Sequence, residues 1–210
     1  MNIIQDFIPK GNRNRPGNTM NPRYITVHNT GNVNNGANAL GHSNFIKSLA
    51  AGSTSWHYTV DDQRIVQHLP TNENGWHAGD GGHGPGNRTS IGIEICENAD
   101  GNYAKAEEKA VELIVHLMET HNIPVENVVS HKKWSNKQCP HRILPRWGAF
   151  IETIKEKASE KTVAKRFDEV PDWARPSVKK LMDRGIIGDP VGDATFYRIA
   201  VILDRLKVIA

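Results

Sequence analysis

The chain has 210 residues, the length of one full domain plus a small additional unit, and this is enough to bury a core without disulfide bonds. Its composition, with 38% hydrophobic and 23% charged residues and no apolar run near the roughly 20 residues of a membrane helix, excludes insertion into a membrane. A net charge of +3 is too small to indicate a nucleic-acid-binding protein, and two cysteines exclude a disulfide scaffold.

The first half of the chain is rich in glycine and asparagine and predicts short strands joined by long loops. Residues 1–17 are polar, so we expect no secretory signal peptide. Residues 23–28 alternate and are rich in β-branched side chains, which predicts a strand. A weak helical pattern covers residues 37–51, and residues 56–60 and 64–68 predict a hairpin.

A glycine-rich loop and a further strand follow the hairpin. Residues 71–90 contain six glycines and little that can pack, so we expect a long loop that is functional or mobile. Residues 91–96 alternate strictly, with isoleucines on one face of the predicted strand. Glu94 lies on the opposite face, together with Gly92 and Cys96.

The next part of the chain alternates between helices and a strand. Residues 104–121 have apolar side chains at helical spacing, and residues 125–130 predict a short strand. Another helix begins at Pro145. This alternation predicts an α/β fold, a mixed central β-sheet flanked by helices.

The C-terminal part predicts a separate small unit. We expect a catalytic domain over residues 1–155, and a charged, weakly patterned linker over residues 156–165. Residues 166–210 carry two short apolar stripes at helical spacing, which predicts a small helical module.

Two histidines and a cysteine form the strongest candidate site. His28 and His131 each stand at the end of a short predicted strand segment, and ends of neighbouring strands lie at one edge of a sheet. With Cys139 in a following proline-rich loop, they supply the nitrogen and sulfur ligands that zinc prefers, leaving a fourth position for water. His141 is a weaker candidate for the third position. The alternative is a buried cysteine and two ordinary histidines at the edge of the sheet.

Three further side chains are candidates for catalysis beside such a metal. Lys137 can stabilise an oxyanion, although a solvated loop lysine is the plain alternative. Glu94, between isoleucines, can take a proton from water and return it to a leaving amine, or it can be an exposed-face glutamate. Tyr58 can direct its phenol at the site from the hairpin, or it can be a core tyrosine.

Five ordered motifs between about residues 20 and 150 carry a family resemblance. They are Ile25-Thr26-Val27-His28-Asn29-Thr30, Ser55-Trp56-His57-Tyr58-Thr59-Val60-Asp61, Trp76-His77-Ala78-Gly79, Asn87-Arg88-Thr89-Ser90-Ile91-Gly92-Ile93-Glu94, and Ser130-His131 with Lys137-Gln138-Cys139-Pro140. In these motifs the chain resembles the zinc-dependent N-acetylmuramoyl-L-alanine amidases of the type-2 family, which share their fold with peptidoglycan recognition proteins.

The resemblance implies an activity and a set of site residues. It implies one catalytic zinc bound by His28, His131 and Cys139, catalytic roles for Glu94 and Lys137, and a place for Tyr58 near the metal. The activity implied is hydrolysis of the amide between N-acetylmuramic acid and L-alanine in peptidoglycan. From the same motifs we expect substrate contacts from Asn29, Trp76, His77, Asn87 and Arg88, in a groove walled by residues 71–90 and 29–44.

The chain departs from the family pattern in two places. His141 stands where the family often has glycine after Cys-Pro, and residues 79–86 are longer than expected. Non-catalytic relatives that only bind peptidoglycan typically lose the cysteine ligand, and Cys139 is retained. A peptidoglycan-binding protein with a structural zinc is nevertheless the alternative from another functional class.

The C-terminal residues resemble, more loosely, half of an S-layer-homology-type wall module. The residues involved are Phe167-Asp168-Glu169-Val170, Trp173-Ala174 and Gly185-Ile186-Ile187-Gly188-Asp189. An amidase followed by a unit that binds a secondary cell-wall polymer is the layout of a phage or prophage endolysin. Such an enzyme is made in the bacterial cytoplasm and acts on the wall after release. A host autolysin with the same activity is the alternative.

Overall fold

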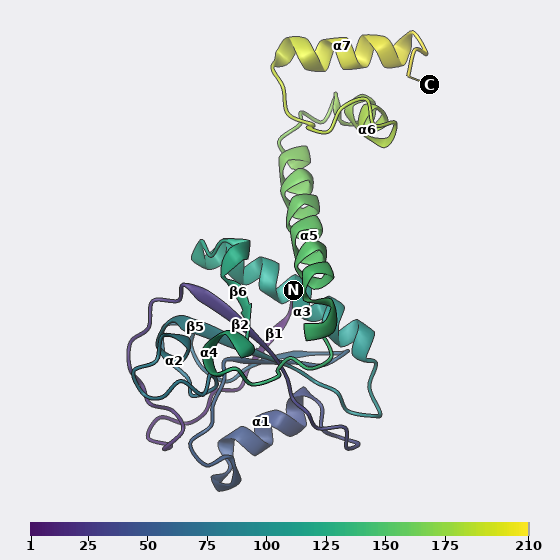
Figure 1. The fold of residues 1–210 in the computed structure, drawn as a ribbon. Helices are drawn as coiled ribbons and strands as arrows, with labels where there is room; N and C mark the ends of the chain where they lie inside the picture. The colour runs from purple at the N-terminus through teal and green to yellow at the C-terminus, as the bar shows by residue number, and fades with distance from the viewer. Residues whose placement is uncertain (210) are drawn as a thin grey trace. The chain divides into compact units, whose positions relative to one another are not determined.

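The computed structural model describes residues 1–209 and consists of two compact units, Met1–Lys155 and Glu156–Ala210. The first unit is built on a six-stranded sheet in the order β1-β4-β3-β5-β2-β6 (Figure 1). The strands are β1 (Ile3–Gln5), β2 (Tyr24–Asn29), β3 (Tyr58–Val60), β4 (Ile65–Gln67), β5 (Ser90–Ile95) and β6 (Val128–Ser130). Among the six described strands, β3 and β4 pair antiparallel and the other pairs are parallel, which confirms the mixed sheet and the hairpin.

Two helices cover the two faces of this sheet. Helix α3 (Tyr103–His121) contacts β3 and β5, whereas α1 (Ala39–Lys47) contacts β3 and β4 from the other side (Figure 1). Strand alternation divides the side chains of β2 and β5 between these faces. The isoleucines expected on one face of β5 are fully buried, and the face toward α1 carries Thr26, His28, Ser90 and Glu94.

The remaining elements of the first unit are short. They are α2 (Pro85–Thr89), α4 (Lys132–Ser135) and the 3-10 turns Leu49–Ala51, Val125–Asn127 and Leu144–Arg146. Helix α2 lies at the end of the segment expected as a loop over residues 71–90. Strand β1 was not expected from the sequence, because its three residues stand in a polar segment and gain their strand structure by pairing with β4.

The second unit has a helical core of its own. Helices α6 (Arg175–Asp183) and α7 (Ala194–Arg205) pack around a cluster of apolar side chains. Its buried members are Val170, Ala174, Val178, Leu181, Tyr197, Ala200 and Ile209.

Helix α5 (Trp147–Asp168) includes the residues expected as a linker. Residues 156–165 are therefore helical, because this charged segment is rich in good helix formers and carries an ion pair between Lys157 and Glu160. Within residues 1–209, no helix has the length and apolar character needed to cross a membrane.

Candidate metal centre and catalytic site

The two candidate histidine ligands lie at the same edge of the sheet. His28 is near the end of β2, and His131 directly follows β6. Because β2 and β6 are parallel neighbours, their carboxyl ends place both imidazoles together. The ring centroids are 4.7 Å apart, and both side chains are buried.

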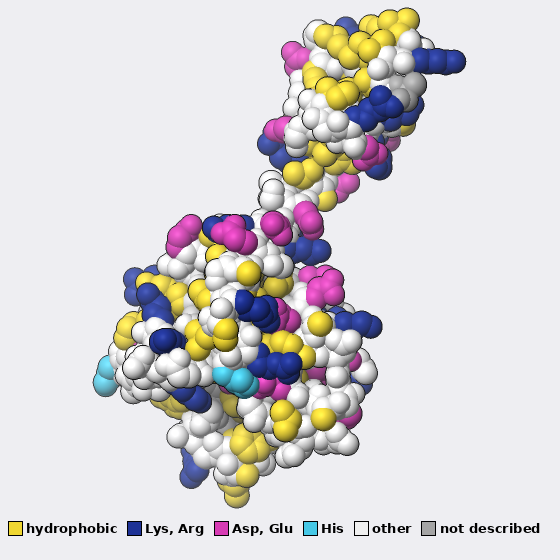
Figure 2. Space-filling model, turned by 45° about the vertical axis from the view of Figure 1, so that its right-hand side comes forward, with side chains coloured by type: hydrophobic (Ala, Val, Ile, Leu, Met, Phe, Trp, Pro, Cys, Tyr) yellow, Lys and Arg dark blue, Asp and Glu magenta, His cyan; other side chains and the backbone are white. Residues whose placement is uncertain are grey.

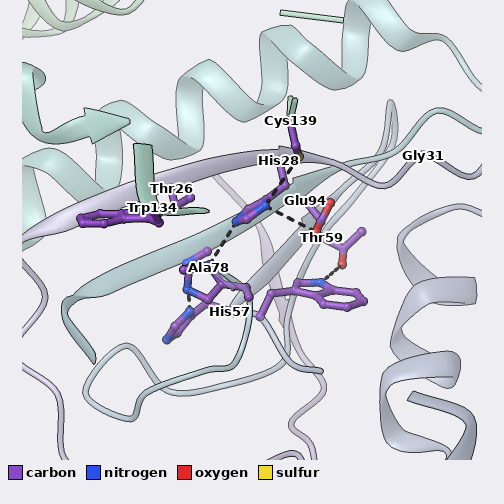
Figure 3. Close-up of polar contacts among 12 residues, drawn as sticks. Thr26, His28, Gly31, His57, Thr59, Ala78, Glu94, Trp134 and Cys139 are labelled. Carbon is purple, nitrogen blue, oxygen red and sulfur yellow. Dashed lines mark hydrogen bonds and ion pairs between the residues drawn. The ribbon is translucent and has the colours of Figure 1, made fainter. Parts of the chain in front are cut away.

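Cys139 reaches the two histidines from the loop that follows α4. The Cys139 carbonyl accepts a hydrogen bond from Lys132 N at 3.2 Å, and Arg142 N donates to Asn29 Oδ1 at 3.0 Å. The loop is therefore hydrogen-bonded to the residues that directly follow His131 and His28. Cys139 Sγ lies 3.8 Å from His28 Nδ1 (Figure 3). The ligand atoms of His28, His131 and Cys139 all lie within 4.8 Å of one another.

The chemistry of these three side chains fits a zinc ion. Burial lowers the pKa of His28 and of His131, so both imidazoles are neutral and offer a lone pair. Both ring nitrogens of His131 are buried without a hydrogen-bond partner. Burial raises the pKa of the Cys139 thiol to about 11, so the thiolate requires a cation beside it. Two nitrogens and one sulfur leave a fourth position in a tetrahedral zinc site.

Glu94 lies beside the ligand cluster on the next strand. It stands in register with His28 on β2 and with Thr59 on β3, and its Oε1 is 3.9 Å from His28 Nδ1 (Figure 3). Its Oε2 is buried without a hydrogen-bond partner. Burial raises the pKa of Glu94 to about 8, and the positive charge of Lys137 opposes this rise. Lys137 itself is exposed on the loop of residues 136–142, which carries Cys139 and is called the metal loop below.

The expected place of Tyr58 near the metal is wrong. Tyr58 stands in register with Ile93, so it shares the apolar face under α3, and its neighbour Thr59 shares the face of Glu94. The side chain is buried, and burial raises its pKa above the ordinary value. Alternation along β3 therefore makes Tyr58 a core residue.

His141 does not belong to the ligand cluster. Its Nε2 lies 2.9 Å from Glu97 Oε1, and its side chain is half exposed. Glu97 is buried and also accepts a hydrogen bond from Gly31 N at 2.7 Å. The imidazole that departs from the family pattern therefore pairs with a carboxylate at the edge of the metal loop, and Cys139 is the third ligand candidate.

The five residues expected to contact substrate occupy different surroundings. Asn29 is buried and donates to Tyr103 Oη at 3.0 Å. Asn87 is buried, and its Oδ1 accepts hydrogen bonds from the backbone of His77 and Ala78, both at 2.8 Å. The side chains of Trp76 and Arg88 are half-buried. His77 is buried behind His28.

An open cavity of about 470 Å³ lies next to Glu94 and identifies residues that the sequence motifs missed. Its wall comes from the asparagine-rich segment after β2, from α1 and from Trp56. The lining residues are Thr30, Asn32, Asn34, Asn35, Gly36, Ala37, Gly41, His42, Phe45, Trp56 and Glu94. Within residues 1–209, this lining includes none of the five residues expected to contact substrate.

A comparison with protein families shows which family the chain belongs to. A family model described as N-acetylmuramoyl-L-alanine amidase matches residues 18–142, which include every candidate metal ligand and Glu94. The chain belongs to this amidase family. The metal loop and β2, β5 and β6 all lie inside the matched segment, so the family relationship covers the whole candidate site.

Curated members of the amidase family are similar over most of this chain. XlyA of Bacillus subtilis (strain 168), an N-acetylmuramoyl-L-alanine amidase, is 53% identical over 193 residues, which are 90% of this chain and 64% of XlyA. CwlH of the same organism is 58% identical over 152 residues, which are 72% of this chain and 60% of CwlH. The chain thus spans less than two thirds of the length of either relative.

Solved structures of amidase-family members share the fold of the first unit. The catalytic domain of XlyA superimposes with a TM-score of 0.71 at 60% identity, covering 73% of this chain and 99% of that domain. PlyL superimposes with a TM-score of 0.67 at 43% identity, covering 73% of this chain and 97% of PlyL. These matches confirm the expected fold of a mixed sheet flanked by helices.

Proposed function

We propose that this chain hydrolyses the amide bond between N-acetylmuramic acid and L-alanine in peptidoglycan and acts as an endolysin. The observation that carries the proposal is the buried cluster of His28, His131 and Cys139 beside Glu94, in a chain of the N-acetylmuramoyl-L-alanine amidase family. The similarity to XlyA, which extends over 90% of the chain, supports the same activity.

His28, His131 and Cys139 hold a single zinc ion in this proposal. When bound, zinc supplies a Lewis acid that activates a water molecule and polarises the scissile carbonyl. Glu94 accepts the proton of the attacking water at its carboxylate and returns it to the departing amine of L-alanine. A pKa raised to about 8 suits a group that must both take and give a proton near neutral pH. The Lys137 ammonium stabilises the oxyanion.

The cavity beside Glu94 is the proposed substrate groove. Glu94 is the only carboxylate in its described lining, and asparagine side chains and backbone groups of residues 30–37 form one wall. Amide groups of this kind suit the hydroxyl and acetamido groups of a sugar and the peptide bonds of a stem peptide. Residues 29–44 therefore form the expected groove wall, and Trp76 and Arg88 remain proposals for contacts outside this cavity.

The C-terminal unit is proposed to bind a secondary polymer of the cell wall. Several large apolar side chains of this unit are exposed, among them Trp173, Ile199 and Leu206. On the face shown in Figure 2, apolar side chains of the unit lie beside both basic and acidic side chains. Exposed apolar side chains on a small unit are typical of a binding surface. In this proposal the enzyme is made in the cytoplasm and acts on the wall after release.

Product chemistry tests the proposed activity. Purified cell walls are incubated with the full chain, and new L-alanine amino termini are measured against new reducing ends. We expect amino termini without reducing ends, loss of activity after chelation, and recovery with added zinc. Reducing ends alone indicate a glycosidase, and neither product indicates a peptidoglycan-binding protein with a structural zinc. The unpartnered carboxylate oxygen of Glu94 beside the ligand cluster argues against a purely structural metal.

A second experiment separates an endolysin from a host autolysin, which gives the same product. The chain is expressed inside susceptible bacteria, and the culture is then treated with an agent that opens the cytoplasmic membrane. An endolysin leaves the culture intact until the membrane is opened and then lyses it. Lysis or release into the medium without that treatment contradicts the endolysin assignment.

A further inference from the structure

His77 lies directly behind the candidate metal ligand His28. His28 Nε2 and His77 Nδ1 are 3.0 Å apart, the two rings meet edge to face with their centroids 5.1 Å apart, and both side chains are buried. The other ring nitrogen of His28, Nδ1, lies on the side of Cys139 Sγ and Glu94 Oε1 (Figure 3). His28 thus has one nitrogen toward the ligand cluster and one toward His77.

The surroundings of His77 fix which of its nitrogens carries the hydrogen. Its Nε2 is 3.3 Å from the Ser90 carbonyl oxygen, which can only accept a hydrogen bond. The hydrogen is therefore on Nε2. The His77 ring is buried, and among the described residues no carboxylate pairs with it, so it is neutral and its Nδ1 is an acceptor.

The arrangement of His77 determines the hydrogen of His28 in turn. Because His77 Nδ1 accepts, His28 Nε2 donates, and in a neutral imidazole the remaining nitrogen is then bare. His28 Nδ1 is left as a lone pair on the side of Cys139 Sγ. We propose that His77 is a positioning residue that fixes the tautomer and ring orientation of His28, so that Nδ1 is the atom offered to the metal. This inference rests on the proposed metal site.

The sequence around His77 is built to hold its ring in this place. A side chain at Gly92 of β5 would bring its Cβ within 2.8 Å of His77 Cγ, so the ring lies against the strand only because residue 92 is glycine. Asn87 accepts the backbone N–H of His77 at 2.8 Å. The motifs over residues 76–79 and 87–94 therefore contact each other here, and Asn87 and Gly92 hold His77 against His28.

His57, which lies next to His77 on the side away from His28, has the same tautomer as His77. Its Nδ1 accepts the backbone N–H of Gly92 at 3.0 Å, which leaves the hydrogen on Nε2, 2.9 Å from the Glu73 carbonyl oxygen. The His57 and His77 rings are 5.9 Å apart. Backbone groups hold both rings, and the direction of the hydrogen bond to His28 is set by the backbone carbonyl of Ser90 acting on His77.

The role of His77 differs from that of a fourth ligand or a substrate contact. Its Nδ1 faces His28 rather than Cys139, and it lies outside the ligand cluster of the described residues. Its buried ring lines no part of the cavity beside Glu94. Hydrogen-bond partners of metal-bound histidines typically change metal affinity by about 10- to 100-fold.

Zinc affinity of two variants of the full chain tests this inference. His77→Leu removes the acceptor, and His77→Asn places an amide oxygen near the position of Nδ1. Zinc dissociation constants are measured by competition with a chromophoric chelator. We expect His77→Leu to weaken zinc binding by about 10- to 100-fold and His77→Asn to recover most of it. Zinc binding by His77→Leu that equals wild type overturns the inference.

A control variant and a direct readout complete the experiment. His68→Gln, at another buried histidine outside the ligand cluster, is expected to leave zinc affinity unchanged. Long-range ¹H–¹⁵N NMR of metal-free wild type is expected to show hydrogens on Nε2 of both His28 and His77. A hydrogen on Nδ1 of His28 overturns the inference even if His77→Leu fails to fold. Failure of wild type to bind zinc refutes the proposed function instead, and the NMR result still decides the tautomer.

Discussion

Acidification is expected to destabilise the first unit through its buried neutral histidines, and His68 is the clearest case. Its side chain is fully buried next to β4, and its Nε2 is 2.8 Å from Thr59 Oγ1. Burial lowers the pKa of His68 from 6.5 to about 3. His68 is not among the candidate metal ligands, so the effect of its titration is separate from the proposed zinc site.

The sign and size of the effect follow from proton binding. In the unfolded chain His68 takes up a proton below about pH 6.5, whereas in the folded chain it stays neutral until about pH 3. The contribution of neutral His68 to the free energy of unfolding is therefore complete above pH 6.5 and is lost as the pH falls toward 3. Each pH unit in this window is worth about 1.4 kcal/mol, so about 2 kcal/mol is lost by pH 5.

Urea denaturation of wild type and His68→Gln at pH 7 and pH 5 measures this contribution. Glutamine keeps a hydrogen-bonding group for Thr59 but does not titrate in this range. We expect the variant to lose about 2 kcal/mol less than wild type between the two pH values, whatever its stability at pH 7. His83→Gln, at an exposed histidine, is the matched control and is expected to lose as much as wild type. Equal losses in wild type and His68→Gln would refute the reasoning.

Three further predictions concern the candidate metal site and each of the two units. Cys139→Ser is expected to lower bound zinc per chain, measured by elemental analysis, whereas Cys96→Ala, outside the ligand cluster, keeps it; equal zinc in both contradicts the ligand assignment. Phe150→Ala empties a buried position of α5 and is expected to cost about 3–5 kcal/mol in urea denaturation, and a cost below about 1 kcal/mol contradicts its place in the core. Asp193→Ala removes the side chain that caps α7 through Phe196 N at 2.8 Å, and is expected to cost the second unit about 1 kcal/mol while Asp193→Asn costs little.

The grouping of the candidate metal ligands could be predicted because it depends on strand ends. His28 and His131 each stand at the end of a recognisable β pattern, and the ends of parallel neighbouring strands meet at one edge regardless of the details of packing. The alternation of β5 likewise placed Glu94 opposite the isoleucines. The register between neighbouring strands could not be predicted from the sequence, because tertiary packing sets it.

The features that the sequence analysis predicted wrongly or did not predict also depend on the register and packing of distant segments. Alternation along β3 was visible, but only its register with β5 shows that Thr59, and not Tyr58, shares the face of Glu94. The contact between His28 and His77 joins segments 49 residues apart, and no local pattern encodes it. Strand β1 depends on β4 in a comparable way.

The candidate site differs from the rest of the polar face of the sheet in how many of its buried polar atoms lack hydrogen-bond partners. Buried polar groups there are costly unless they are paired, and most are: Thr26 Oγ1 lies 2.7 Å from Ser90 Oγ and accepts from Trp134 Nε1 at 2.8 Å. Among the described residues, seven buried side-chain atoms lack a partner, and three of them are Glu94 Oε2 and the two ring nitrogens of His131. Their concentration at one place, beside Cys139 and His28, is the pattern expected where a metal ion and a substrate complete the bonding.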